Sequence, residues 1–112
     1  MATVINCDMG EGYGIYRLGE DEKLMPIIDL ANIACGFHGS DPNHMRKTVQ
    51  LAKESGVQVG AHPSFPDRQG FGRRPMVIER EELTNIIIYQ IGALNGFLAA
   101  EGLQLNLSLI HI

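Results

Sequence analysis

The fold is decided by residues 32–41, which read N-I-A-C-G-F-H-G-S-D. The apolar first half of this stretch has the pattern of a buried strand. Asp41 followed by Pro42 has the pattern of a helix start, because an Asp side chain accepts the orphan N–H groups of the first turn. His38 therefore lies between a strand end and a helix start. In proteins of alternating strands and helices, ligands bind at such places, outside the carboxyl ends of parallel strands.

Outward from this stretch, strand-like and helix-like segments alternate along the chain. The patterns predict strands at 3–7, 31–35, 57–61 and 103–112, and helices at 20–30, 42–55 and 79–101. Hairpin signals are absent between successive strands, and parallel strands need a crossover that is usually a helix. We therefore expect an α/β fold with a parallel sheet, either half of a (β/α) barrel or a small open sheet.

Length, charge and cysteine content narrow the class of protein. The 112 residues suffice for one core but not for two domains. The formal net charge of -4 gives no electrostatic reason to expect nucleic acid, so a small molecule or another protein is the expected partner. Cys7 and Cys35 are expected to be buried reduced thiols in a cytoplasmic protein. The sequence lacks a signal-peptide pattern, and the apolar run at 86–88 is too short to span a bilayer, so no membrane is expected.

Acidic and imidazole side chains follow each of the first three predicted strands. They are Asp8 and Glu11, then His38 and Asp41, then His62 and Asp67. Because the carboxyl ends of parallel strands meet at one edge of a sheet, we expect these groups to converge. Their composition fits either a general acid/base site or a divalent-metal site, the latter with Asp8, His38 and His62 as ligands.

Some of these residues have simpler explanations. Asp41 is most simply a helix cap, and His44 is expected to be solvated surface on the helix that follows. The glycines at 10, 12 and 14 resemble a nucleotide loop only loosely, since Ile15 stands where a dinucleotide fingerprint needs Gly and no Walker lysine follows. Sequence motifs therefore locate no nucleotide site.

The segment 67–75 is rich in Gly and Arg and has no periodicity, which is typical of a functional loop. Arg73 and Arg74, with Arg68 nearby, could bind an anionic substrate through a forked pair of N–H groups. The alternative is a solvated loop in which they pair with the acidic residues at 79–82. The sequence leaves both open.

Four blocks of the sequence together resemble a known family. They are N-C-D-M-G-E-G-Y-G at 6–14, A-N-I-A-C-G-F-H-G-S-D-P at 31–42, V-G-A-H-P-S-F-P-D-R-Q-G-F-G-R-R at 59–74 and Y-Q-I-G-A-L at 89–94. The family is LamB/YcsF, which is associated with the A subunit of bacterial 5-oxoprolinase. The resemblance runs from about residue 4 to residue 102 without a visible gap.

The resemblance implies a distorted (β/α) TIM-like barrel, related to the glycoside hydrolase and deacetylase barrels. It also implies an enzyme that opens 5-oxo-L-proline to L-glutamate with ATP and Mg²⁺, together with the B and C subunits as partners. Asp8, Glu11, His38 and His62 are then the expected catalytic residues. Asn6, Arg73 and Arg74 are the residues expected to bind the substrate.

Two other functions fit the same residues. One is a divalent-metal-dependent deacetylase or hydrolase of the same barrel type. The other is a non-catalytic module that binds a carboxylate or docks a partner.

A (β/α) barrel takes roughly 250 residues, so residues 1–112 are expected to form a single partial barrel domain. Members of the family continue after the long helix into a strand that carries V-K-P-H-G, whereas this chain reads N-L-S-L-I-H-I at 106–112. We expect 106–112 to be a divergent, non-native tail. We also expect the chain by itself to be inactive and poorly soluble, because half a barrel leaves open strand edges.

Overall fold

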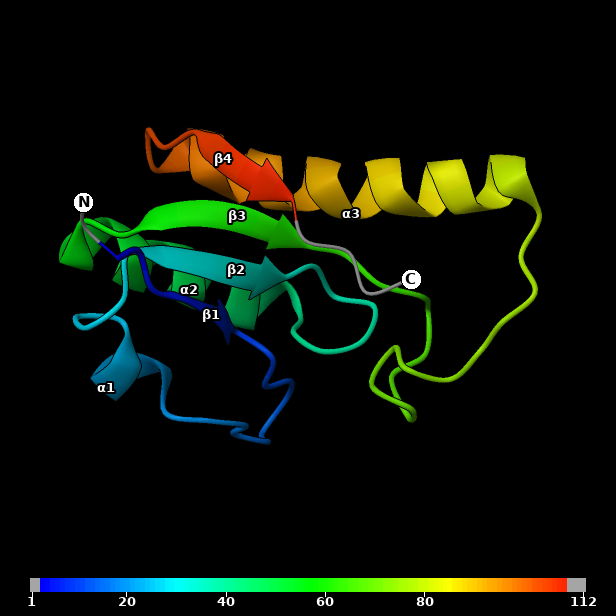
Figure 1. Ribbon diagram of the computed structural model, residues 1–112, viewed down its shortest axis with the longest axis horizontal. Coiled ribbons are helices and arrows are strands. Elements are labelled where there is room, and N and C mark those ends of the chain that lie inside the picture. Colours follow the sequence, from blue (N-terminus) through cyan, green and yellow to red (C-terminus); the bar gives the residue numbers. More distant parts are fainter. Residues whose placement is uncertain (1–2, 109–112) are drawn as a thin grey trace.

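The computed structural model describes residues 3–108 of the chain, and within them strands and helices alternate as the sequence predicts (Figure 1). The elements in chain order are β1 (Asn6–Met9), α1 (Asp21–Leu24), β2 (Leu30–Ala34), α2 (Pro42–Ser55), β3 (Gln58–His62), α3 (Arg80–Ala100) and β4 (Leu105–Ser108).

The four strands form one parallel sheet in the order β1-β2-β3-β4, which confirms the predicted fold class. Asp8 of β1 lies opposite Asn32 of β2, which lies opposite Gly60 of β3. Strands in simple chain order are the arrangement of a (β/α) barrel, whereas doubly wound open sheets reverse their order at a switch point. The sheet thus has the strand order of a TIM-like barrel. All loops that follow β1, β2 and β3 leave it at the same end (Figure 1).

The two faces of the sheet differ because successive side chains along a strand point to opposite sides. One face is apolar and forms the core with residues of α2 and α3. This core includes Met9, Ala31, Ile33, Val59 and Ala61 of the strands, Met45, Val49 and Ala52 of α2, and Leu94 and Leu98 of α3. The other face carries polar side chains at its centre, where Asn6, Asp8, Asn32 and His62 lie. The polar face is the one that a complete barrel encloses.

The helix α2 begins and ends at the predicted residues. The Asp41 carboxylate accepts a hydrogen bond from the backbone N–H of His44 at 2.8 Å, and Pro42 occupies the first turn. Gly56 follows the last turn with a φ of 67°, a left-handed conformation that favours glycine. Both helix boundaries therefore follow from local sequence chemistry.

The first strand and the first helix differ from the prediction. β1 starts at Asn6 instead of Thr3 and continues to Met9, so Asp8 lies within the strand and not after it. The helix predicted at 20–30 is wrong in length, because α1 ends at Leu24. Pro26 has no N–H to continue the helical ladder, and Leu30 already pairs in β2.

The long helix α3 was predicted within one residue at each end. It runs antiparallel to the strands, and its N-terminal half extends past their carboxyl ends (Figure 1). By length and composition it could cross a membrane, with a mean hydropathy of 1.4, and 17% of the window is buried. One such helix is weak evidence for a membrane span, so the expected absence of a membrane stays a prediction.

Two expectations concern the end of the chain. β4 runs over Leu105–Ser108, and the rest of the strand predicted at 103–112, including His111, lies outside the described residues. The expected partial-barrel domain with a divergent tail at 106–112 stays a prediction.

Candidate functional site

Four side chains converge at the carboxyl end of the sheet, and we call Asp8, Glu11, His38 and His62 the acid–imidazole cluster. His38 Nε2 lies 2.8 Å from Glu11 Oε2. His62 Nδ1 lies 3.5 Å from Asp8 Oδ1 and 4.0 Å from Glu11 Oε2. The two imidazole rings are 4.7 Å apart between centroids. The parallel sheet thus brings together residues that are far apart in sequence, as expected.

Burial differs between the bases and the acids of this cluster. The side chains of His38 and His62 are each 2% exposed, whereas those of Glu11 and Asp8 are 18% and 33% exposed. The rings are therefore shielded from water, and the carboxylates lie toward solvent. Electrostatic interactions are stronger in such a shielded environment than in water. Within residues 3–108, His38 Nδ1 is also buried without a hydrogen-bond partner, which is a feature of functional sites.

Close packing of two loops sets the Glu11–His38 contact. A Cβ atom on Gly39 would lie 2.6 Å from the carbonyl oxygen of Glu11, so only glycine allows this approach. The next residue, Ser40, donates its backbone N–H to the same carbonyl at 3.4 Å. Ser40 has a φ of 72°, which is unusual for a residue other than glycine. The loop after β2 is therefore held against the loop after β1.

Asn32 is a member of the site that the sequence prediction missed. It is 1% exposed in the middle of β2, and its Nδ2 donates to Asn6 Oδ1 at 3.1 Å and to Asp8 Oδ1 at 3.3 Å. Its own Oδ1 is buried and has no hydrogen-bond partner in the part of the chain that the structure describes. Asn is depleted in strands, and that signal could have singled it out. Through Asn32, Asn6 is connected to the cluster.

The cluster also contains a ligand set for a divalent metal. One ligand atom each from Glu11, His38 and His62 lies within 4.8 Å of the others. A tetrahedral zinc ion with bonds of about 2 Å holds its ligands roughly 3.3 Å apart, so small side-chain movements would complete the site. The metal ligands expected from the sequence were Asp8, His38 and His62, so the observed set has Glu11 in place of Asp8. The geometry favours Glu11, since its carboxylate lies closer to His38.

The arginines at 73 and 74 do not join the cluster. Arg74 forms an ion pair with the buried Asp67, with Nε at 2.9 and 3.0 Å from the two carboxylate oxygens. Hydrogen bonds from Arg74 lower the pKa of Asp67 to about 2. Arg74 therefore does not pair with the acidic residues at 79–82, which was the expected alternative to anion binding. For the Arg73 side chain no ion pair or hydrogen bond occurs within residues 3–108. Substrate binding by Arg73 and Arg74 stays a prediction.

Asp41 serves as the helix cap that the sequence predicts. Besides the His44 N–H it accepts the backbone N–H of Gly14 at 2.6 Å and lies 2.9 Å from His44 Nδ1. Burial disfavours the ionised form, but these hydrogen bonds outweigh it and lower the pKa of Asp41 to about 2. His44 is therefore tied to Asp41 on α2 and is not a member of the acid–imidazole cluster.

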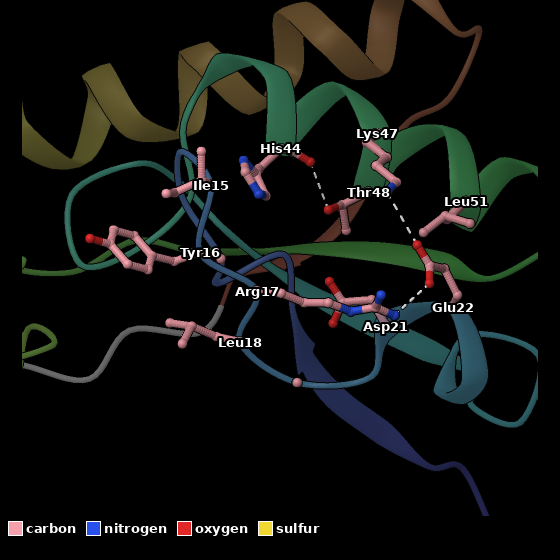
Figure 2. A pocket seen from close by; sticks show the side chains of 12 residues that line it. Ile15, Tyr16, Arg17, Leu18, Asp21, Glu22, His44, Lys47, Thr48 and Leu51 are labelled. Atoms are coloured by element: carbon pink, nitrogen blue, oxygen red, sulfur yellow. Dashed lines mark hydrogen bonds and ion pairs between the residues drawn. The ribbon is translucent and has the colours of Figure 1, made fainter.

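A separate pocket of 150 Å³ lies between the loop after β1 and α2 (Figure 2). Its two long cationic side chains, Arg17 and Lys47, both pair with Glu22, at 2.6 and 3.2 Å. Burial raises the pKa of Asp21 on the same pocket wall. The pocket has no member of the acid–imidazole cluster in its lining. Its charges are neutralised internally, so we assign it no role in the chemistry.

Comparisons with known proteins agree on one family. The LamB/YcsF family model matches residues 3–111. The chain is 55% identical over 102 residues to the A subunit of 5-oxoprolinase from Bacillus licheniformis, covering 91% of this chain and 40% of that protein. It is 59% identical over 104 residues to the lactam utilization protein lamB of Emericella nidulans, covering 93% of this chain and 41% of that protein.

A solved structure gives the same result. The crystal structure of the lactam utilization protein from Thermus thermophilus superposes with a TM-score of 0.96 at 50% identity, covering 99% of this chain and 45% of that one. The chain thus spans less than half the length of these relatives. On the matched sequence and the shared fold, the chain belongs to the LamB/YcsF family.

Proposed function

We propose that the chain acts in the hydrolysis of a cyclic amide, 5-oxo-L-proline, as part of the A subunit of a 5-oxoprolinase. The observation that carries this proposal is the buried Glu11–His38 pair, 2.8 Å long, beside His62 at the strand ends. Curated relatives over 50% identical to this chain are named as the A subunit of 5-oxoprolinase, which supports the choice of substrate.

The chemistry that we propose couples ring opening to ATP. A lactam resists attack by water, and transfer of the γ-phosphoryl group of ATP to the amide oxygen would create a leaving group. Water then attacks the ring carbon, the C–N bond breaks and the nitrogen takes a proton, which leaves an acyl phosphate. A second water hydrolyses the acyl phosphate and releases inorganic phosphate. The products are L-glutamate, ADP and phosphate. Mg²⁺ would accompany the nucleotide, as is usual for phosphoryl transfer.

The cluster supplies groups suited to these proton transfers. One shielded imidazole removes a proton from the attacking water, and the other delivers a proton to the ring nitrogen. Glu11 orients the His38 ring, as a carboxylate does in other acid–imidazole pairs. Asp8 lies in the corresponding position next to His62. Asn6 and Asn32 provide amide groups that could bind the substrate.

Partners and location belong to the same proposal. The sequence contains no nucleotide motif, and the chain spans about 40% of the length of its curated relatives. We therefore assign ATP binding to other parts of a complex with the B and C subunits. The free thiols of Cys7 and Cys35 support a cytoplasmic location.

The test is ATP-dependent glutamate formation from 5-oxoproline by the full-length parent protein in the presence of the B and C subunits. We expect His38→Ala and His62→Ala to reduce the rate by about 100-fold or more, since a positioned acid or base contributes that much. The matched control is His44→Ala, which removes an imidazole outside the cluster. Unchanged rates for the first two variants would remove these residues from the mechanism.

A second candidate is a divalent-metal-dependent deacetylase or hydrolase. The Glu11, His38 and His62 atoms within 4.8 Å of one another favour it, because two histidines and a carboxylate form a common catalytic zinc site. Metal analysis separates the two functions. Stoichiometric zinc together with ATP-independent turnover would support the metal-dependent enzyme and exclude the ATP-coupled one.

A further inference from the structure

The loop that follows β3 is closed on itself between Asp67 and Arg74, and we call it the 67–74 loop. The Asp67 carboxylate binds Arg74 and accepts the backbone N–H of Gly70 at 3.0 Å. The Asp67 carbonyl accepts the N–H of Gly72 at 2.7 Å. A loop with this many internal bonds keeps its shape and can act as a rigid cap.

The tip of this loop covers His38. The Phe71 ring meets the His38 ring edge-on, with centroids 4.9 Å apart. Phe71 has a φ of 57°, and a bulky side chain holds such a conformation only where the surroundings enforce it. The next residue, Gly72, is so close that a Cβ there would lie 3.0 Å from the Cβ of His38. Phe71 and Gly72 therefore leave His38 little freedom on this side.

One side chain, Arg68, joins the 67–74 loop to both other loops of the site. Its Nη2 donates to the carbonyl oxygens of Gly36 at 2.8 Å and Ser40 at 2.9 Å. These two residues stand two positions before and two positions after His38. The guanidinium carbon also lies 4.4 Å from the centre of the Tyr13 ring, two residues after Glu11. A planar guanidinium can donate these hydrogen bonds and stack on the ring at the same time, whereas an ammonium can donate but has no planar face to stack.

The Arg68 guanidinium forms no ion pair with any other residue that the structure describes. Within residues 3–108 no carboxylate lies within ion-pair distance of it, in contrast to Arg74 on the same loop, which is bound to Asp67. The contacts of Arg68 are two neutral carbonyl groups and an aromatic face. They fix the backbone on both sides of His38 relative to the loop that carries Glu11.

We infer that Arg68 is a positioning residue that fixes His38 against Glu11 by joining the loops after β1, β2 and β3. It acts through the backbone of Gly36 and Ser40 and does not touch the reacting atoms. This inference deepens the proposed function, and its kinetic consequence rests on that function.

The test compares Arg68→Met with Arg46→Met, a matched change at an exposed arginine of α2 whose side chain has no ion pair or hydrogen bond in the described residues. The first part of the test does not depend on enzyme activity. One measurement is the rate of amide hydrogen exchange at Ser40. The other is the ¹⁵N NMR signal of His38 Nε2, which is assigned by its disappearance in His38→Gln. We expect Ser40 exchange to accelerate by about tenfold or more in Arg68→Met, since its bond to Glu11 opens more often. The Nε2 signal should shift or broaden, and Arg46→Met should match the parent.

The second measurement is turnover. Arg68→Met should lower kcat by about tenfold to a hundredfold with KM unchanged, because displacement of a catalytic group by about 1 Å has effects of that size. Arg68→Lys retains charge and donors and should recover part of the loss. If Arg68→Met does not fold, Arg68→Lys replaces it in both measurements.

Two results would overturn the inference. One is agreement of Arg68→Met with Arg46→Met in both the NMR measurement and kcat. The other is a raised KM at unchanged kcat, which would make Arg68 a substrate-binding residue. If the parent protein shows no lactam turnover, the proposed function fails, while the exchange and NMR comparison still decides whether Arg68 positions His38.

Discussion

Two carboxylate–imidazole pairs in this molecule have the same chemistry and nearly the same length. Glu11 and His38 lie 2.8 Å apart, and Asp41 and His44 lie 2.9 Å apart. The first pair is buried, with side chains 18% and 2% exposed, whereas those of the second are 26% and 28% exposed. The distance alone therefore does not identify a reactive pair, and burial together with neighbouring groups does.

The origin of the two pairs differs as well. Asp41 and His44 are three residues apart at the start of α2, where any helix with an Asp cap and a His three residues later can form such a contact. Glu11 and His38 are 27 residues apart and meet only because two strands are parallel and two loops pack together. The local pair stabilises a helix, and the non-local pair is available for chemistry.

The largest difference is expected when the two histidines are replaced in the same way. His38→Gln should lower ATP-dependent glutamate formation by about 100-fold or more, whereas His44→Gln should leave it within about twofold, because only a positioned base contributes on that scale. Steady-state kinetics with the partner subunits checks this. Equal losses of turnover in both variants would mean that His38 contributes no more to the reaction than His44 does.

Stability should respond in the opposite order. Asp41→Ala removes a helix cap and should lower the free energy of unfolding by about 1 kcal/mol. Glu11→Gln should leave it unchanged or raise it, since Gln can still accept from His38 and one of two neighbouring carboxylate charges is removed. Urea unfolding of both variants is the measurement. A loss for Glu11→Gln greater than that for Asp41→Ala would contradict the assignment of structural and functional roles.

The stability of the protein at acidic pH gives a further test of the structural role of Asp41. The pKa of Asp41 falls from 3.8 to about 2 in the folded protein, so its contribution is complete above about pH 4. As the pH falls from about 4 through 2, Asp41 becomes protonated and that contribution is lost. Asp41→Asn should therefore have a flatter stability curve than the parent in this range. Parallel stability curves for Asp41→Asn and the parent would show that the charge of Asp41 does not contribute to the free energy of unfolding.

The smallest effect is expected at the exposed ion pairs of the pocket in Figure 2. Lys47→Met breaks the contact with Glu22 and should change the free energy of unfolding by less than about 0.5 kcal/mol, since exposed pairs contribute little. Thermal melting at low and high salt measures it. A loss comparable to that of Asp41→Ala would mean that this exposed ion pair stabilises the fold as much as the helix cap does.

Local chemistry made part of this molecule predictable from sequence. The ends of α2 follow from Asp41, Pro42 and Gly56, and the parallel sheet follows from the alternation of strand and helix patterns. The convergence of His38 and His62 then follows from the sheet. The predicted length of α1 was wrong because the helical pattern of apolar residues continues past Pro26, which cannot donate the backbone hydrogen bond that a helix needs.

Contacts between loops could not be predicted in the same way. The role of Arg68 depends on three loops meeting, and Phe71 was not expected in a left-handed conformation over His38. Asn32 was hidden in an apolar strand, although its polar side chain was a usable signal. The pairing of Arg74 with Asp67 likewise depends on how the loop closes.

The central claim is that the Glu11–His38 pair is the reactive one. The most direct measurement is the rate of glutamate formation in Glu11→Gln and Asp41→Asn, two changes that each replace a carboxylate by its amide. Asn remains a good helix cap, so Asp41→Asn should retain turnover within about twofold. Glu11→Gln should lose about 100-fold or more in kcat. Turnover by Glu11→Gln equal to that of Asp41→Asn would contradict the claim.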